Sequence, residues 1–483
     1  MTDVKNKLAQ VDQPSEAYTA MAKHWHLADS LIGGTVAMRE AGELYLPKEP
    51  KEEQSWYNTR LERAVLFPGF AKALRNLTGK AFASSVAVKD ASPQWQEWFK
   101  NIDLAGSTLQ QFCERSFLDG LCYGHTTILA EYPVVSPAAT LYDERNIIKA
   151  RPYLLNRSAK QIIGWRSQTV SNQTKLTRVR MREATTLYAD EWDDDGDAYQ
   201  VRVLTPGGYA IYQQNADGDW FLAAEGSVSI KDKIPLVPVY FDKLGEMQSR
   251  LPLHDLAWTN VAHWQSYSDQ RTILRVARVP IIFVNGATEE ELGGQITIGP
   301  NTFMTLQNPN ADMKFVEHSG AAITAGRQDC VDLEERMMSL AAEPMMARPG
   351  SDTATGRAID ARDAISPLSV WVANFEHAIN TAFEMMAEYG QVDKAPTVQM
   401  TRDFGILGNT SDLDALIRSR QLGEISRKTF LEEMKRRGVL NEMFDPEEDA
   451  TELANEPPPP PVQGGFGAVD PQGGNPPDEQ VAQ

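Results

Sequence analysis

The stretch ARPGSDTATGRAID, residues 347–360, comes nearest in this sequence to a phosphate-binding motif. A nucleotide-binding P-loop follows a buried strand and has four residues between two glycines, then Lys and Ser or Thr. Here five residues separate Gly350 from Gly356, the next two positions hold Arg and Ala, and a helical pattern precedes them. These departures argue against a nucleotide site. They leave a plain helix-to-helix connection or a functional loop.

A second candidate is the acidic run EWDDDGDAYQVR, residues 191–202, which resembles a calcium-binding loop. Asp193, Asp195 and Asp197 have suitable spacing, but Arg202 occupies the place of the bidentate acid that closes such a loop. Strand-like sequence also flanks the run. We therefore predict a solvated hairpin turn, with weak divalent-ion binding as the alternative.

The remaining polar residues form no recognisable catalytic or metal-binding constellation. The seven histidines include no H-E-x-x-H pair, the chain has no G-x-S-x-G elbow, and Cys113, Cys122 and Cys330 lack metal-ligand spacing. The odd number of cysteines favours a reducing compartment. We expect no catalytic residues, no metal ligands and no cofactor.

Three arginines recur at helical spacing, Arg271, Arg275 and Arg278. We interpret them as a strip that forms ion pairs between subunits, with the acid-rich segment 329–335 as its counterpart. Contact with nucleic acid is the alternative, and the acidic surroundings disfavour it.

The overall composition indicates a multidomain chain with real hydrophobic cores. It has 483 residues, 42% of them hydrophobic, and a net charge of -19. Much of that charge lies after Arg437, where ten acids occur without a Lys or Arg. The mildly acidic remainder argues against a tight electrostatic grip on nucleic acid. No apolar run is long enough to span a membrane, so we expect no membrane contact.

The first half of the chain predicts helices followed by a β-rich region. Residues 1–54 suggest a weakly ordered arm, and 55–83 suggest two short helices broken at Pro68-Gly69. A helix capped by Ser107 should lead into the strand TTILAEYP. The alternating segments LTRVRMREA, YQVRVLT and YAIYQQ then predict hairpins, and the prolines of IPLVPVYF predict an edge strand.

The second half is dominated by long helices. Residues 251–280 predict one helix whose polar middle, Ser268 to Thr272, suits packing between subunits better than packing in a core. Further helices are expected over 322–346 and from Ser366-Pro367 onward, which is either a helix start or a kink. Small helices should follow at 411–422 and 426–437, and a disordered tail beyond 456.

Several stretches together resemble the portal proteins of tailed bacteriophages, the head-to-tail connectors of the virion. They are RPYLLNRSAKQIIGWR, IPLVPVYFDKLG, LHDLAWTNVAHWQSYSDQRTILRVARVPIIFVNG and MMSLAAEPMMARPGSDTATGRAIDARDAISPLSVWVANFEHAI. The resemblance spans about residues 55 to 455 and consists of packing patterns. It implies an α+β portal fold with a β-rich wing, long stem helices, a small clip, a helical crown and a disordered C-terminal tail.

Carried over by position, the resemblance divides the chain into nine parts. These are an N-terminal arm (1–54), the wing (55–248), the first stem helix (249–279), the clip (280–319), the second stem helix (320–346), the tunnel loop (347–361), a long wing helix and strand (362–405), a small crown (406–455) and the tail (456–483). The site residues it implies are the DNA-contacting tunnel loop, Arg348, Gly350, Ser351, Thr353, Thr355 and Arg357, and the subunit-interface stem, Trp264, Arg271, Arg275, Asp332 and Glu335.

The resemblance also implies a function and partners. The chain would form a ring, of twelve copies in most of the family, at the portal vertex of the capsid, after assembly in the host cytoplasm. Double-stranded DNA would pass through it during packaging and ejection. The terminase packaging motor, a head-tail adaptor and the major capsid protein would bind it. The alternatives are a metal-dependent nuclease using Asp193 to Asp197, or a capsid-associated adaptor that forms no channel.

Overall fold

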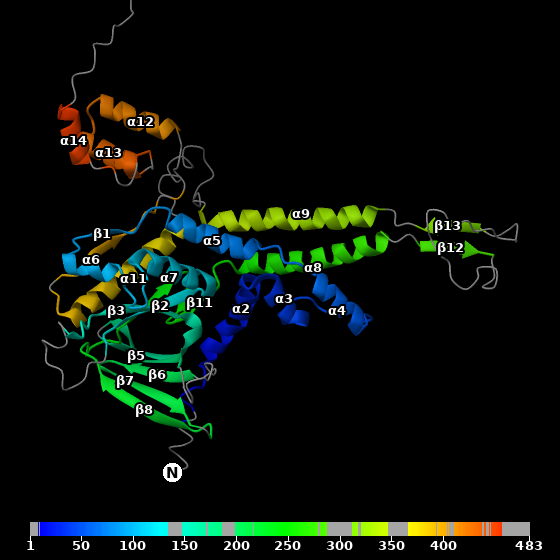
Figure 1. Ribbon diagram of the computed structural model, residues 1–483, viewed down its shortest axis with the longest axis horizontal. Coiled ribbons are helices and arrows are strands. Elements are labelled where there is room, and N and C mark those ends of the chain that lie inside the picture. The colour runs from blue at the N-terminus through cyan, green and yellow to red at the C-terminus, as the bar shows by residue number, and fades with distance from the viewer. Residues whose placement is uncertain are drawn as a thin grey trace, which may run out of the picture. The chain divides into compact units, whose positions relative to one another are not determined.

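The computed structural model describes residues 8, 10–133, 147–170, 172–185, 199–215, 217–278, 281–286, 312–316, 320–345, 366–392, 394–402, 404, 410–436, 439–440, 444 and 446–455. The chain divides into two compact units, Met1–Gly405 and Ile406–Gln483, and each is described by itself (Figure 1). The described residues combine helices and antiparallel sheets. The expected α+β class is therefore confirmed.

The N-terminal region is helical, and the expectation of a weakly ordered arm was wrong for residues 16–41. Helix α2, Glu16–Ile32, begins at Ser15, whose Oγ accepts a hydrogen bond from the Tyr18 amide, and α3 follows at Gly34–Ala41. Trp25 and Leu31 of α2 are buried in the main core. After the short turn η1 (Gly42–Leu44), α4 (Gln54–Arg63) and α5 (Gly69–Ala81) are the two expected short helices.

The centre of the first unit is a helix that feeds directly into a buried strand. Helix α7, Leu109–Tyr123, is capped by Thr108 and Gln111, one residue later than expected. Gly124, at φ 90°, turns the chain into β2, His125–Glu131. A Cβ at Gly124 would lie 2.4 Å from the Arg250 carbonyl oxygen, so the turn requires glycine.

Strand β2 is the middle strand of a three-stranded antiparallel sheet. Its neighbours are β3, Tyr153–Ser158, and β9, Leu236–Tyr240. The two prolines in the sequence around β9 had predicted an edge strand, and β9 occupies an edge. Helices α6 (Pro93–Phe99) and α11 (Pro367–Gly390) complete the core, together with the pair formed by β1 (Ala87–Lys89) and β14 (Thr397–Gln399).

The expected hairpins form one five-stranded antiparallel sheet in sequence order. Its strands are β4 (Ile162–Val170), β5 (Gln173–Ala184), β6 (Tyr199–Thr205), β7 (Gly208–Gln214) and β8 (Trp220–Ser227). A short 3-10 turn, η3 (Ala159–Gln161), precedes β4, and the small pair β10 (Lys243–Gly245) and β11 (Gln248–Ser249) precedes α8. Val179, Met181 and Leu204 anchor this sheet in a second, smaller core.

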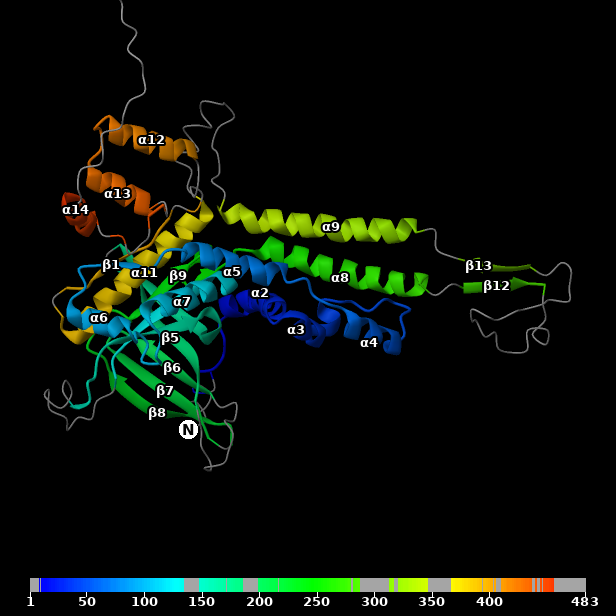
Figure 2. The same cartoon turned by 45° about the horizontal axis from the view of Figure 1, so that its top comes forward.

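Two long helices lie side by side in both views (Figure 2). They are α8, His254–Ala277, and α9, Ala321–Ala342, which ends in the turn η4, Glu343–Met345. Between them in the chain come β12 (Ile281–Asn285) and β13 (Asp312–Val316), which pair antiparallel. Because the connection is a hairpin, α8 and α9 run in opposite directions.

The second unit consists of small helices, as the sequence predicted. They are α12 (Thr410–Gln421), α13 (Arg427–Arg436) and α14 (Pro446–Asn455). An ion pair between Arg427 and Asp449 joins α13 to α14. Within the described ranges of the chain, no helix combines the length and the apolar content that a bilayer crossing demands.

Candidate subunit interface on the long helix pair

Part of the predicted site lies outside the described residues. This holds for the whole tunnel loop, 347–361, with Arg348, Gly350, Ser351, Thr353, Thr355 and Arg357, and for the acidic run Asp193 to Asp197. The five predicted stem residues are all described. The structure separates them into three environments: the protein core, a groove beside α4, and the outward side of α9.

The seam between α8 and α9 is held by polar contacts within one chain. His263 Nε2 lies 3.2 Å from Glu334 Oε1, and the Ser266 hydroxyl donates to Asp329. Further along, Gln270 Nε2 donates to the Ile323 carbonyl oxygen at 2.9 Å. His263, Ser266 and Gln270 therefore face α9 of the same chain and fix the register of the two helices. The rest of the expected polar middle, Ser268, Arg271 and Thr272, lies on the side of α4.

Burial along α8 changes abruptly halfway. From Leu256 to Trp264 the helix packs against the main core, whereas no residue after Gln270 is buried. Trp264 itself is fully buried in that core. Trp264 was expected at a subunit interface, but the apolar stripe of α8 still faces the rest of the chain at this level, so the indole is a core side chain of its own protomer.

Beyond Trp264 the same face of α8 carries arginines in place of apolar residues. Residues 264, 268, 271, 275 and 278 follow one another at intervals of three or four, so Arg271, Arg275 and Arg278 continue the face that carries Trp264. This part of the helix faces α4, and a groove of about 460 Å³ lies between the two. The arginine strip therefore lines a hollow and is not packed on α9.

Helix α4 contributes its own half of this groove, which we call the arginine groove. It is lined by Glu52, Trp56, Thr59, Arg60, Arg63, Ala64, Ser268, Arg271, Thr272, Leu274, Arg275 and Arg278. The Arg275 guanidinium lies 5.6 Å from the centroid of the Trp56 ring, a cation–π contact. Sequence reasoning predicted the helix α4 but missed its part in this site, although Trp56, Arg60 and Arg63 have the same i, i+4, i+7 spacing as the strip on α8.

Of the five arginines that line the groove, one is neutralised within the described part of the chain and four are not. Arg60 binds both Glu52 carboxylate oxygens, at 2.9 and 2.8 Å, and this contact lowers the pKa of Glu52. Arg63, Arg271, Arg275 and Arg278 are exposed and form no ion pair within the described part of the chain. The groove is therefore a site of uncompensated positive charge.

The outward side of α9 carries the complementary groups. Asp332 and Glu335 are exposed, whereas Glu334 and Asp329 of the same helix contact α8. Two large apolar side chains are exposed beside them, Met338 at 62% and Val331 at 37%. Cys330 and Met337 are the buried residues of this 22-residue helix.

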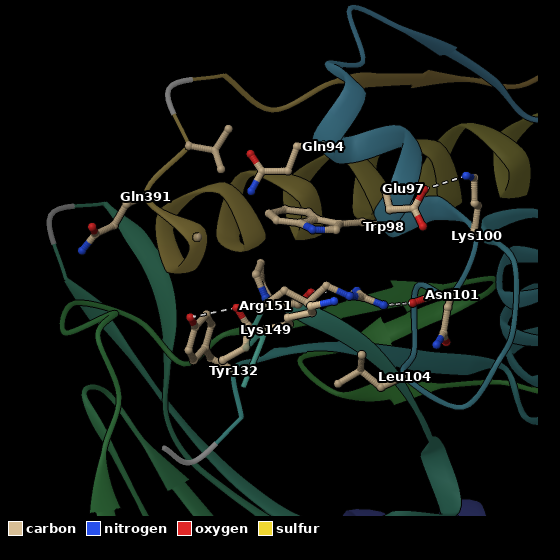
Figure 3. A pocket seen from close by; sticks show the side chains of 14 residues that line it. Gln94, Glu97, Trp98, Lys100, Asn101, Leu104, Tyr132, Lys149, Arg151 and Gln391 are labelled. Atoms are coloured by element: carbon tan, nitrogen blue, oxygen red, sulfur yellow. Dashed lines mark hydrogen bonds and ion pairs between the residues drawn. The ribbon is translucent and has the colours of Figure 1, made fainter. Parts of the chain in front are cut away.

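A larger hollow, of about 840 Å³, lies between α6, the segment before β3 and the end of α11 (Figure 3). Several of its polar groups are already bound within the chain. Arg151 donates to the Asn101 and Pro152 carbonyl oxygens, the Tyr132 hydroxyl donates to Ala150, and Lys100 pairs with Glu97. The Arg151–Asn101 and Tyr132–Ala150 contacts join the walls of the hollow to one another.

Cys113, Cys122 and His125 are buried inside the first unit. Burial raises the pKa of the Cys122 thiol to about 12 and that of Cys113 further, so both stay protonated. Burial also lowers the pKa of His125 to about 4, and its Nδ1 lies 2.7 Å from the Ser249 hydroxyl. Among the residues that the structure describes, no three acidic, histidine or cysteine side chains are arranged to hold a metal ion.

A family model described as a domain of unknown function (DUF4055) matches residues 252–390, the region from α8 to α11, which is less than half of the chain. No curated protein sequence matches.

Similar solved structures come from gene transfer agent (GTA) particles, each with 11% sequence identity. One is from the neck of an empty particle computed with C6 symmetry, with a TM-score of 0.39, covering 80% of this chain and 90% of that chain. Another is from the virion of the native particle, with a TM-score of 0.38 and the same coverage. A third is from the neck of the native particle computed with C12 symmetry, with a TM-score of 0.40, covering 84% and 99%. These scores are too low to establish a shared fold.

Proposed function

We propose that this chain is a non-enzymatic structural component of a phage-type virion, and specifically the subunit of a portal ring. The observation that carries the proposal is the high solvent exposure of the helix pair formed by α9 and the second half of α8. An antiparallel pair of helices with so little buried surface gains little stability from its own packing. Exposed apolar side chains such as Met338 indicate a surface that another molecule covers.

In a closed ring of identical subunits, neighbouring copies would cover the exposed surface of the helix pair. In a head-to-tail ring every copy offers one face to the preceding copy and a different face to the next. The helix pair has two such faces, the arginine groove and the outward side of α9. The resemblance of the sequence to portal proteins assigns these helices to the stem, and twelve copies is the expected ring size.

The proposed channel conducts double-stranded DNA during packaging and ejection. A conduit must not retain its cargo, because each phosphate neutralised by a protein cation adds salt-dependent affinity. A chain with net charge -19 suits this requirement. In the tunnel loop, Arg348 and Arg357 would make transient phosphate contacts, and Gly350, Ser351, Thr353 and Thr355 would provide reach.

The ring would also be a docking platform. Its proposed partners are the terminase packaging motor, a head-tail adaptor and the major capsid protein, all at one vertex of the virion. The sequence has no Walker motif. The hydrolysis of ATP that drives packaging is therefore assigned to the motor and not to this chain.

Native mass spectrometry and negative-stain electron microscopy of the purified full chain test this proposal. We expect rings with a central hole and a mass corresponding to about twelve subunits. A chain that stays monomeric at all protein and salt concentrations would refute it, and closed particles without a hole would favour the adaptor alternative. Deleting residues 350–356 tests the loop separately: normal DNA packaging and retention would remove the loop from the mechanism.

A further inference from the structure

We propose that the arginine groove between α4 and α8 is the socket for α9 of the neighbouring copy. This makes α4, whose role the sequence left open, one wall of the subunit interface. The inference rests on the proposed ring and adds to it which two surfaces meet.

The first argument is the order of the helices. In both views α8 lies between α4 and α9 (Figure 2), so the groove and the outward side of α9 are on opposite sides of one rod. Opposite, non-identical surfaces are what a head-to-tail contact needs. Repetition of the contact places α9 of one copy against α4 and α8 of the next.

The second argument is charge. Arg63, Arg271 and Arg278 have no acidic partner among the described residues of their own copy. Asp332 and Glu335 face away from α8, and among the described residues the one hydrogen bond to Asp332 comes from Gln328 of the same helix, at 2.6 Å. Between Ala321 and Ala342, α9 carries four acids and two arginines, so its overall charge also opposes that of the groove. The opposite charges favour contact between the arginine groove and the outward side of α9. They disfavour contact between two grooves or between two α9 helices.

The third argument is apolar surface. Trp56, at the rim of the groove, is 58% exposed, and Met338 on α9 is 62% exposed. A tryptophan framed by arginines is typical of the side chains that contribute most to binding at protein interfaces. A polyanion in the groove would leave Met338 and Val331 uncovered, whereas a second copy covers both surfaces at once.

The register of the pair adds a geometric consequence. Within one copy Gln270 is opposite Ile323 and His263 is opposite Glu334, so Asp332 and Glu335 lie roughly ten residues, or about 15 Å, along the pair from the groove arginines. The neighbouring helix pair must therefore be shifted along α8. In a closed ring this shift arises when the helices are inclined to the ring axis.

Charge reversal tests the inference on the full chain. We compare Arg271→Glu/Arg275→Glu, Asp332→Arg/Glu335→Arg, and the chain that carries all four changes. A matched control, Lys175→Glu/Lys231→Glu, reverses two exposed lysines outside the helix pair. Ring formation is measured by native mass spectrometry at several salt concentrations, and folding by circular dichroism.

We expect each reversal alone to raise the dissociation constant of the ring contact by at least about a hundredfold, because like charges then face each other. The fourfold variant should recover most of the ring, and the control should assemble as the wild type does. Recovery also excludes misfolding as the cause of the loss, since a chain unfolded by either pair would stay unfolded with both.

The other outcomes overturn the inference in distinguishable ways. Rings that persist in both single reversals, or a fourfold variant that does not recover, refute the socket and leave the portal proposal standing. Loss of DNA binding by the groove reversal with rings intact identifies a polyanion site instead. A wild-type chain that forms no ring refutes the portal proposal and the socket together.

Discussion

Helices α9 and α11 have nearly the same length but opposite relations to the rest of the chain. Of the 24 residues of α11 twelve are buried, including Phe375, Ile379 and Phe383, whereas two of the 22 residues of α9 are buried. Both sequences are amphipathic. The apolar face of α11 is therefore buried by its own chain. We infer that the exposed face of α9 is buried by a neighbouring subunit.

The largest effect should come from truncating a side chain of α11. Phe383 is fully buried and stacks on Phe99, with a centroid separation of 5.4 Å. Phe383→Ala should lower the free energy of unfolding of the monomer by about 3–5 kcal/mol, because it removes apolar contacts and leaves a cavity. Urea denaturation measures the change. Met338→Ala in α9 is the matched control and should cost under about 0.5 kcal/mol in the monomer; equal losses would contradict the contrast between the helices.

Ring assembly should protect the backbone amides of α9, which are poorly protected in the monomer. In the monomer its backbone amides should exchange with solvent readily, because few tertiary contacts oppose local opening. In the ring we expect the exchange to slow by about a hundredfold, as coverage by a neighbour stabilises the helix. Hydrogen exchange measured by mass spectrometry on both species tests this. Amides of α11, already buried, should change little, and equal slowing in both helices would indicate a global effect.

The sequence predicted the helices well and their environments less well. Periodicity placed α8, α9 and α11 within a few residues, and Gly423 marked the end of α12. It also defined the stripe that runs from Trp264 to Arg278. It did not show where along this stripe the core ends, because that depends on packing against distant segments such as α5.

The helices of the N-terminal region and the arginine groove were not predicted from the sequence. The helical spacing of Met21, Trp25, Ala28 and Leu31 in α2 was present, but the surrounding polar residues obscured it. The groove joins Trp56 to Arg275, which are far apart in the sequence. Residue types can propose an ion-pairing strip, but only the fold shows that α4 lies beside it and that Glu334 and Asp329 are already engaged.

A smaller effect should distinguish α4 from both long helices. The hydrogen bonds and charge of Arg60 lower the pKa of Glu52, so the ionised carboxylate stabilises the fold above the pKa it has when unfolded. This stability is lost as pH falls through the lowered pKa. Glu52→Gln should cost about 1 kcal/mol at pH 7, and the difference from the wild type should shrink below about pH 4. Urea titrations at several pH values measure it, and a difference independent of pH would contradict the assignment.

The smallest effect concerns how the two long helices begin. Helix α11 starts at Ser366, whose Oγ accepts the Ser369 amide hydrogen at 3.2 Å, whereas α9 starts at Gly320 without a side-chain cap. Removing the cap with Ser366→Ala should lower the free energy of unfolding by about 1 kcal/mol, since one amide of the first turn loses its acceptor. Ser366→Asp should retain most of the stability, because a carboxylate also caps a helix and opposes its positive end. Should the alanine and aspartate variants be equally destabilised, packing at this position, and not the cap, would set the start of α11.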